Sequence, residues 1–272
     1  MTEVRITHVG GPTTIIEAAG WRILTDPTFD APGRKYTFGW GTSSRKTTGP
    51  AVPASGVGPI DAVLVSHDHH ADNLDDAGRA LLAEAPVVVT TRAGASRLVD
   101  AVGAGPTIGD LRGMAPWQVT TLTAEGKPDI EVTATPCRHG PPLSRPIVGD
   151  VIGFALRWAG QEHGALWVTG DTVLYDEVRQ VPDRVDVGTA ILHLGKVQFP
   201  ITGPIHYSMT AAEAIELCGL VRPRTAIPVH YEGWSHFHQG RPAIEAAMAS
   251  APEAVRSAVV WPTPGTPLEV TV

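Results

Sequence analysis

Residues 60–76 read IDAVLVSHDHHADNLDD, and this stretch decides how the rest of the chain is interpreted. An apolar run over 61–65 is typical of a buried strand, and it ends abruptly in three histidines and several carboxylates. In α/β proteins the loops at the carboxyl ends of the strands form the functional edge. Imidazoles and carboxylates are common metal ligands. The stretch therefore predicts a metal site at the edge of a sheet.

The composition is that of an ordinary globular protein. The chain has 272 residues, 43% of them hydrophobic and 18% charged, with a net charge of −7. No apolar run approaches the roughly 20 residues of a membrane span, and the N-terminus lacks the pattern of a signal peptide. Cys137 and Cys218 are too few for a disulfide framework. We expect a cytoplasmic protein with a small-molecule substrate, no nucleic-acid partner and no membrane span; a homo-oligomer is left open.

The order of predicted elements in the first half of the chain suggests α/β layers. A hairpin turning at 18–20 is followed by a long excursion over 27–59 that is rich in Gly and Pro. The other predicted elements are strand 61–65, a helix near 75–84, strand 86–90, a helix near 93–101 and strand 130–135.

The second half repeats this order, with a hairpin over 151–171, strand 189–194, a helix over 209–220 and strand 224–231. In this alignment Asp26 matches Asp171. The repeat predicts one domain over 1–272, with pseudo-halves of about 1–135 and 136–272. Two such halves packed sheet to sheet form a four-layer αββα sandwich with internal duplication.

Three more predicted strands end in a metal-binding residue type, namely His139, Asp171 and His230. Singly, each has an ordinary interpretation, because a histidine is often only hydrogen-bonded and an aspartate often caps a turn. Four strand ends of the same kind favour a shared metal site. His67 and His69 are two residues apart, so in an extended segment both would point the same way.

Five segments in this order resemble the metallo-β-lactamase fold: TTIIE…WRILTDP, VLVSHDHHADNLD, TPCRHG, WVTGDT and IPVHY, all within residues 6–231. The branch that they resemble includes metal-dependent hydrolases similar to ascorbate-6-phosphate lactonase and N-acyl phosphatidylethanolamine phospholipase D. The resemblance implies the αββα sandwich. It also implies that Asp26 lies behind the ligands and accepts a ring N–H from a ligand histidine. The implied ligands are His67, His69 and His139 for one ion, Asp171 between two ions, and Asp72 and His230 for the second.

The chain departs from the family's H-x-H-x-D-H signature. Residues 67–73 read HDHHADN, with one residue inserted and Asn73 where a histidine is expected. An alternative register aligns Asp68, His70, Asp72 and Asn73 but loses two histidines. The second site is therefore weak, empty or completed by His70.

The resemblance implies a hydrolase in which a divalent cation activates water as hydroxide. Asp72 would orient that hydroxide or take its proton, and His206 would contact the substrate or assist the leaving group. One or two ions of Zn, Mn or Fe suit the ligand set. A two-ion centre of about +1 net charge favours a small anionic ester, lactone or phosphodiester. The altered signature keeps a second hypothesis open, a non-catalytic metal-binding protein that acts as a sensor or partner.

Other residues have weaker indications. His193 ends a strand that matches the one before His67, and Cys137 precedes His139 by two residues. Both could face the site, but burial as ordinary core residues explains them equally well. We assign His236 and His238 to the rim of the pocket. Trp40 and Trp234 would form an apolar wall or pack in the core.

Overall fold

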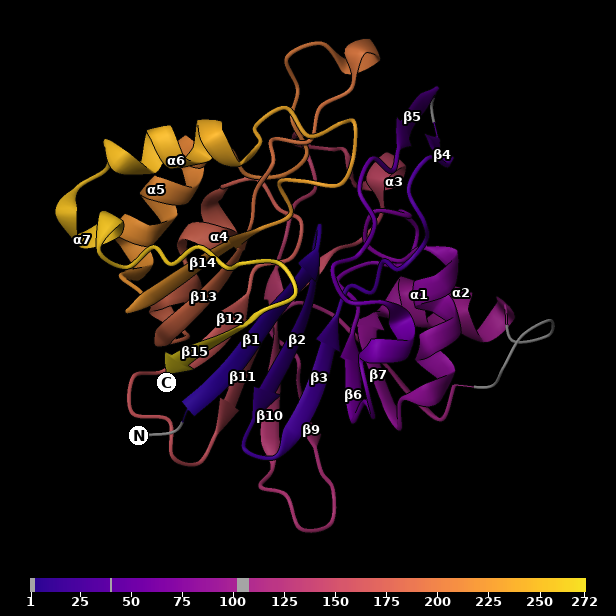
Figure 1. Cartoon of the computed structure of the whole chain (residues 1–272), viewed down its shortest axis with the longest axis vertical. Coiled ribbons are helices and arrows are strands. Elements are labelled where there is room, and N and C mark those ends of the chain that lie inside the picture. Colours follow the sequence, from indigo (N-terminus) through magenta and orange to yellow (C-terminus); the bar gives the residue numbers. More distant parts are fainter. Residues whose placement is uncertain (1–2, 40, 102–107) are drawn as a thin grey trace.

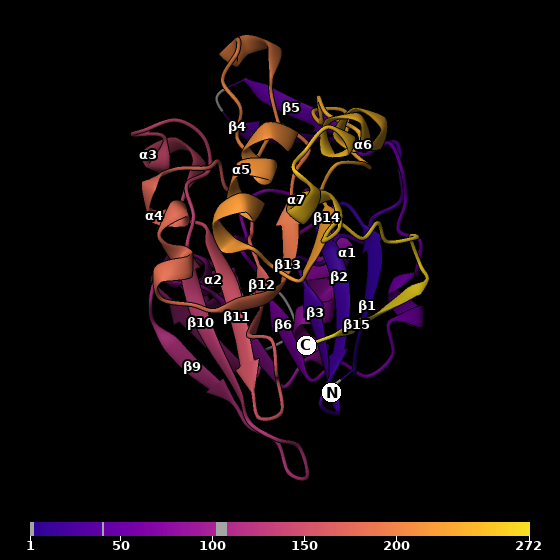
Figure 2. The same cartoon turned by 90° about the vertical axis from the view of Figure 1, so that its left-hand side faces the viewer.

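The computed structural model describes residues 3–39, 41–101 and 108–272, which form four layers (Figures 1 and 2). Two sheets of seven and six strands pack face to face. Helices α1 and α2 cover the outer face of the first sheet, and α5, α6 and α7 cover the second. The helices are α1 (Asp76–Leu81), α2 (Arg92–Ala101), α3 (Arg145–Val148), α4 (Asp176–Arg179), α5 (Ala211–Val221), α6 (Arg241–Ala249) and α7 (Glu253–Arg256).

The first sheet has the order β15-β1-β2-β3-β6-β7-β8. Neighbours from β15 to β3 are antiparallel, and β3, β6, β7 and β8 run parallel. The strands are β1 (Glu3–Gly10), β2 (Thr13–Ala18), β3 (Trp21–Thr25), β6 (Ala62–Leu64), β7 (Val87–Thr91), β8 (Asp110–Met114) and β15 (Pro267–Thr271).

The second sheet has the order β14-β13-β12-β11-β10-β9. Strands β11 and β12 form an antiparallel hairpin, and β12, β13 and β14 run parallel. The strands are β9 (Val119–Leu122), β10 (Ile130–Pro136), β11 (Ile152–Trp158), β12 (Ala165–Val168), β13 (Val187–His193) and β14 (Thr225–Val229).

Both sheets thus contain the same unit, an antiparallel hairpin followed by two parallel strands: β2-β3-β6-β7 in one and β11-β12-β13-β14 in the other. This confirms the predicted αββα sandwich. The chain crosses between the sheets after Met114 and before Val119, earlier than the expected boundary near residue 135. Strand β15 then returns from the C-terminus to the first sheet, beside β1.

Burial on both faces explains the apolar runs. One core lies between the sheets, and two more lie between each sheet and its helices. Every residue of β7 and β13 is buried. The sequence of a strand covered on both faces is a continuous apolar stretch rather than an alternation of apolar and polar residues. This explains the apolar run DAVLV directly before the polar residues.

The excursion over 27–59 contains a hairpin that the sequence did not indicate, β4 (Lys35–Gly39) and β5 (Thr42–Arg45). It lies at the top of the molecule in both views, near α3. Asp75 fastens its base: the carboxylate accepts the amide protons of Phe29, Asp30 and Gly78, the last capping α1. The buried ammonium of Lys46 adds a fourth donor at 2.8 Å.

Within the described parts of the chain, no helix has the length and apolar character needed to cross a membrane.

We predict that Asp75→Ala destabilises the protein more than Lys46→Met. Asp75→Ala leaves the Lys46 charge buried and three amides unpaired, which costs about 3–5 kcal/mol of unfolding free energy. Lys46→Met leaves the carboxylate with its three amide donors and costs about 1–3 kcal/mol. Urea unfolding measures both losses of unfolding free energy. An equal or larger loss for Lys46→Met would contradict the role of Asp75 in fastening the excursion.

Candidate metal centre

The carboxyl ends of strands from both sheets meet at one edge and bring six buried side chains together. They form two groups, and within each group the potential ligand atoms all lie within 4.8 Å of one another. The loop after β6 contributes residues to both groups, and the remaining members of the groups follow strands of the second sheet. The first group is His67, His70 and His139, and the second is Asp72, Asp171 and His230.

The structure places His70, and not His69, with His67 in the three-histidine group. The loop is not extended as the sequence analysis assumed, because the Leu74 amide donates to the His70 carbonyl at 2.9 Å and turns the chain. The His69 ring lies beside those of His67 and His70, with centroids 4.9 and 4.3 Å away, but its Nε2 lies 2.5 Å from the Val148 carbonyl. Alternation of side chains therefore does not apply here, and the distances between potential ligand atoms favour His70 beside His67, while the ligand role of His69 stays a prediction.

Hydrogen bonds at the Nδ1 atoms orient two of these histidines, His67 and His230. The Nδ1 of His67 lies 3.0 Å from the Ser66 hydroxyl. The Nδ1–H of His230 donates to the Leu194 carbonyl at 3.2 Å, which leaves the lone pair on Nε2. That Nε2 lies 3.3 Å from Asp171 Oδ2.

Asp26 supports the loop rather than a member of either group. Its Oδ1 accepts the Ser66 amide proton at 2.6 Å, and its Oδ2 lies 3.5 Å from His193 Nε2. The ring of His193 is in turn 5.6 Å from that of His230. Both Asp26 and His230 have left-handed backbone angles, with φ of 39° and 58°. Such conformations are uncommon outside glycine and concentrate at functional sites.

Burial sets the protonation of the centre. It lowers the pKa of His139 to about 4 and raises the pKa of Asp171, with the charges of Asp72 and Asp26 adding to the effect on Asp171. Burial also opposes ionisation of Asp72, but nearby imidazoles, His236 first, hold its pKa below the ordinary value. The imidazoles are therefore neutral at neutral pH, the form that binds metals. Burial likewise lowers the pKa of His67, His70 and His230.

Unsatisfied polar atoms test whether these residues fit a metal ion. Within the described residues, five buried atoms of the two groups have no hydrogen-bond partner: Asp72 Oδ1, both oxygens of Asp171, His139 Nδ1 and His230 Nε2. Burying such groups unpaired is costly, and divalent cations held by the two groups would satisfy them. The donor set of imidazoles and carboxylates suits Zn, Mn or Fe. Asn73 offers no imidazole, and its amide N–H₂ lies 3.4 Å from the Ser66 hydroxyl.

A cavity of about 140 Å³ opens beside both groups. Its lining includes His70, Asp72 and His139. The rest of the wall is mostly apolar. These residues are Phe38, Gly39, Thr42, Val148, Val197, Phe199, Thr202 and Tyr207.

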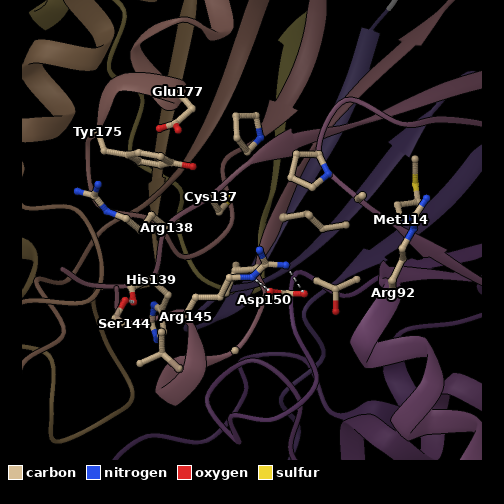
Figure 3. A pocket seen from close by; sticks show the side chains of 18 of the residues that line it. Arg92, Met114, Cys137, Arg138, His139, Ser144, Arg145, Asp150, Tyr175 and Glu177 are labelled. Carbon is tan, nitrogen blue, oxygen red and sulfur yellow. Dashed lines mark hydrogen bonds and ion pairs between the residues drawn. The ribbon is translucent and has the colours of Figure 1, made fainter. Parts of the chain in front are cut away.

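A larger cavity of about 500 Å³ shares His139 with the first (Figure 3). Arg138 lies over the ring of Tyr175 at 4.4 Å. The Cys137 thiol donates to the Thr169 carbonyl at 3.0 Å, and burial raises its pKa. That contact fits a structural residue better than a metal ligand.

The remaining sequence candidates have other contacts. His206 Nε2 lies 3.1 Å from Glu213, whose carboxylate also completes the capping box of α5. His206 does not line the smaller cavity. Trp234 packs on Tyr36 with ring centroids 5.0 Å apart, whereas Trp40 lies outside the described residues.

An αββα sandwich with buried imidazoles and carboxylates at one edge defines the class of metallo-β-lactamase-fold proteins. A family model described as "Beta-lactamase superfamily domain" matches residues 21–231. The chain belongs to this superfamily.

Relatives with curated names are metal-dependent hydrolases. The chain is 29% identical over 236 residues to a UPF0173 metal-dependent hydrolase of Opitutus terrae, covering 84% of this chain and 85% of the relative. A UPF0173 metal-dependent hydrolase of Cupriavidus metallidurans is 27% identical, covering 95% and 86%. The chain thus groups with the metal-dependent hydrolases of its superfamily.

Solved structures share the fold. An isothiocyanate hydrolase from Delia radicum gut bacteria is 17% identical with a TM-score of 0.79, covering 98% of this chain and 99% of that one. A protein described as "a possible metal-dependent hydrolase" from Veillonella parvula is 20% identical with a TM-score of 0.76 and the same coverage. None of these four proteins is named a lactonase or phospholipase, so that branch stays a prediction.

The grouping of His70 with His67 predicts different effects of two neighbouring substitutions. His70→Ala removes an imidazole from the three-histidine group and should lower zinc affinity at least about tenfold. His69→Ala removes a ring that bonds to Val148 and should leave zinc affinity within about twofold. Zinc titration of metal-free protein measures both, and a larger loss for His69→Ala would restore the first register.

Proposed function

We propose that the protein hydrolyses a small ester or lactone with the help of one or two divalent cations. The observation that carries this proposal is the position of the two groups of ligand types, whose members His70, Asp72 and His139 line a cavity. A buried set of potential ligands that also faces a cavity suits catalysis better than a closed structural metal site.

Each group would hold one cation. His67, His70 and His139 would bind the first, and Asp72, Asp171 and His230 the second. Bound in this way, a divalent cation supplies Lewis acidity, polarising the reacting carbonyl and lowering the pKa of water.

Asp72 is the residue of the chain best suited to manage the proton of the attacking water. It lines the cavity, its pKa is held below the ordinary value, and its Oδ1 has no hydrogen-bond partner. An ionised carboxylate in this position can orient a water molecule or accept its proton.

The cavity wall favours a small substrate with an apolar substituent. Its volume of about 140 Å³ is below the roughly 300–1,000 Å³ of pockets for drug-sized ligands. Phe38, Val148, Val197, Phe199 and Tyr207 provide apolar surface, and no Lys or Arg is among the described residues that line the cavity. An anionic substrate would depend on the cations alone for charge recognition, so a neutral ester or lactone is preferred over a phosphodiester.

His206 remains only a predicted aid to the leaving group, since its ring pairs with Glu213. Tyr207, the next residue, reaches the cavity and lies 5.7 Å from the His139 ring between centroids.

The proposal predicts metal-dependent turnover with a defined order of substrates. Zinc- or manganese-loaded protein should hydrolyse p-nitrophenyl acetate and γ-butyrolactone faster than bis-p-nitrophenyl phosphate, and a chelator should abolish turnover until metal is restored. Metal content is measured on the same samples. Full metal content without turnover of any substrate would overturn the proposal in favour of the non-catalytic metal-binding hypothesis.

Phe199→Ala tests whether the smaller cavity is the substrate pocket. Phe199 lines the cavity, so its truncation should raise kcat/KM for p-nitrophenyl hexanoate relative to the acetate by about tenfold. Ile201→Ala is the matched control, because Ile201 is 68% exposed and absent from the cavity wall. An unchanged ratio in Phe199→Ala would place substrate binding elsewhere.

A further inference from the structure

The second group contains one imidazole and two carboxylates, and a further buried imidazole lies next to it. His236 is 3% exposed, and neither ring nitrogen makes a hydrogen bond of good geometry within the described residues, although Nε2 lies close to Asp72. Buried polar side chains are almost always satisfied, so a buried imidazole in this state requires an explanation.

The position of His236 relative to Asp72 explains this state of the imidazole. Its Nε2 lies 3.0 Å from Asp72 Oδ2, and that same oxygen lies 3.9 Å from His230 Nε2. Ligand atoms that bind one cation at about 2.1 Å are neighbours at roughly 3 Å from each other. Asp72 therefore joins His236 to the remainder of the second group.

The surroundings hold the ring in place. The His236 carbonyl accepts the Gln198 amide proton at 3.1 Å, and an isolated bridge pairs Phe237 with Val197. Aromatic rings pack around the imidazole: the centroids of Phe38 and Phe199 lie 5.4 and 5.3 Å away. Apolar neighbours cannot hydrogen-bond the ring nitrogens, so its Nε2 can be satisfied only on the side of Asp72.

We propose that His236 is the fourth protein ligand of the second cation site, together with Asp72, Asp171 and His230. The inference rests on the proposed metal-dependent function and adds a ligand from outside the loop 66–73. It accounts for Asn73, because the imidazole missing from that loop is supplied by a residue far along the chain. Two imidazoles and two carboxylates give the four donors that Zn commonly takes.

Zinc and cobalt titrations of the full chain test the assignment. Metal-free wild type should bind two Zn²⁺ per chain, and His236→Ala should bind one with unchanged affinity. The visible absorption spectrum of Co²⁺-loaded His236→Ala should lack the contribution of one of the two sites seen in wild type. His163→Ala is the control, because His163 lies in the β11–β12 turn and should leave two ions bound. Far-ultraviolet circular dichroism of the metal-free forms checks that each variant is folded.

His236→Gln separates ligation from simple support of Asp72. A glutamine amide can still donate to the carboxylate but is a poor replacement for an imidazole ligand. Loss of one ion in both variants supports ligation. Two ions bound by His236→Gln, or two ions bound with unchanged affinity by His236→Ala, would overturn it. Wild type that binds no metal would instead overturn the proposed function itself.

Discussion

Two carboxylates buried side by side, Asp72 and Asp171, are the constraint on which the centre depends. Both are nearly inaccessible to water, and the charge of Asp72 helps to raise the pKa of Asp171. Neutral imidazoles around them provide lone pairs but no positive charge. A divalent cation would relieve the repulsion and satisfy the unpaired oxygens together. The proposed metal dependence follows from this electrostatic need.

The fold creates this arrangement by bringing two covered sheets together at one edge. Residues after β6 and β10 approach those after β12 and β14, although they are far apart in the chain. The Asp75–Lys46 pair then fastens the β4–β5 excursion against the loop that contains His70 and Asp72. The same excursion contributes Phe38 to the cavity, so a stability device also shapes the proposed substrate pocket.

The predictions from sequence succeeded where local pattern decides structure. Continuous apolar runs identified the buried strands, and the polar residues expected after them include five of the six members of the two groups, whose metal-binding role stays a prediction. His70 rather than His69 joins the three-histidine group because a turn interrupts the extended geometry on which alternation depends. Asp26 was expected to support a ligand, but its nearest imidazole is His193. The cavity wall from Phe38, Phe199 and Tyr207 was not predicted, and His236 was placed only at the rim of the pocket, because neither the excursion nor the segment after His230 has a readable periodicity.

By itself, the sequence determined the layered architecture, the edge at which the polar residues gather and the kind of chemistry that they suit. These properties follow from hydrophobic period and residue type, which are local. Only the tertiary structure decided that His70 groups with His67 and His139, that His236 lies 3.0 Å from Asp72, and that rings from distant segments close the cavity. Those outcomes depend on how turns direct side chains and on which distant segments meet when the two sheets pack. The spacing of residue types along the chain reveals neither the direction of a side chain in a turn nor the contacts between distant segments.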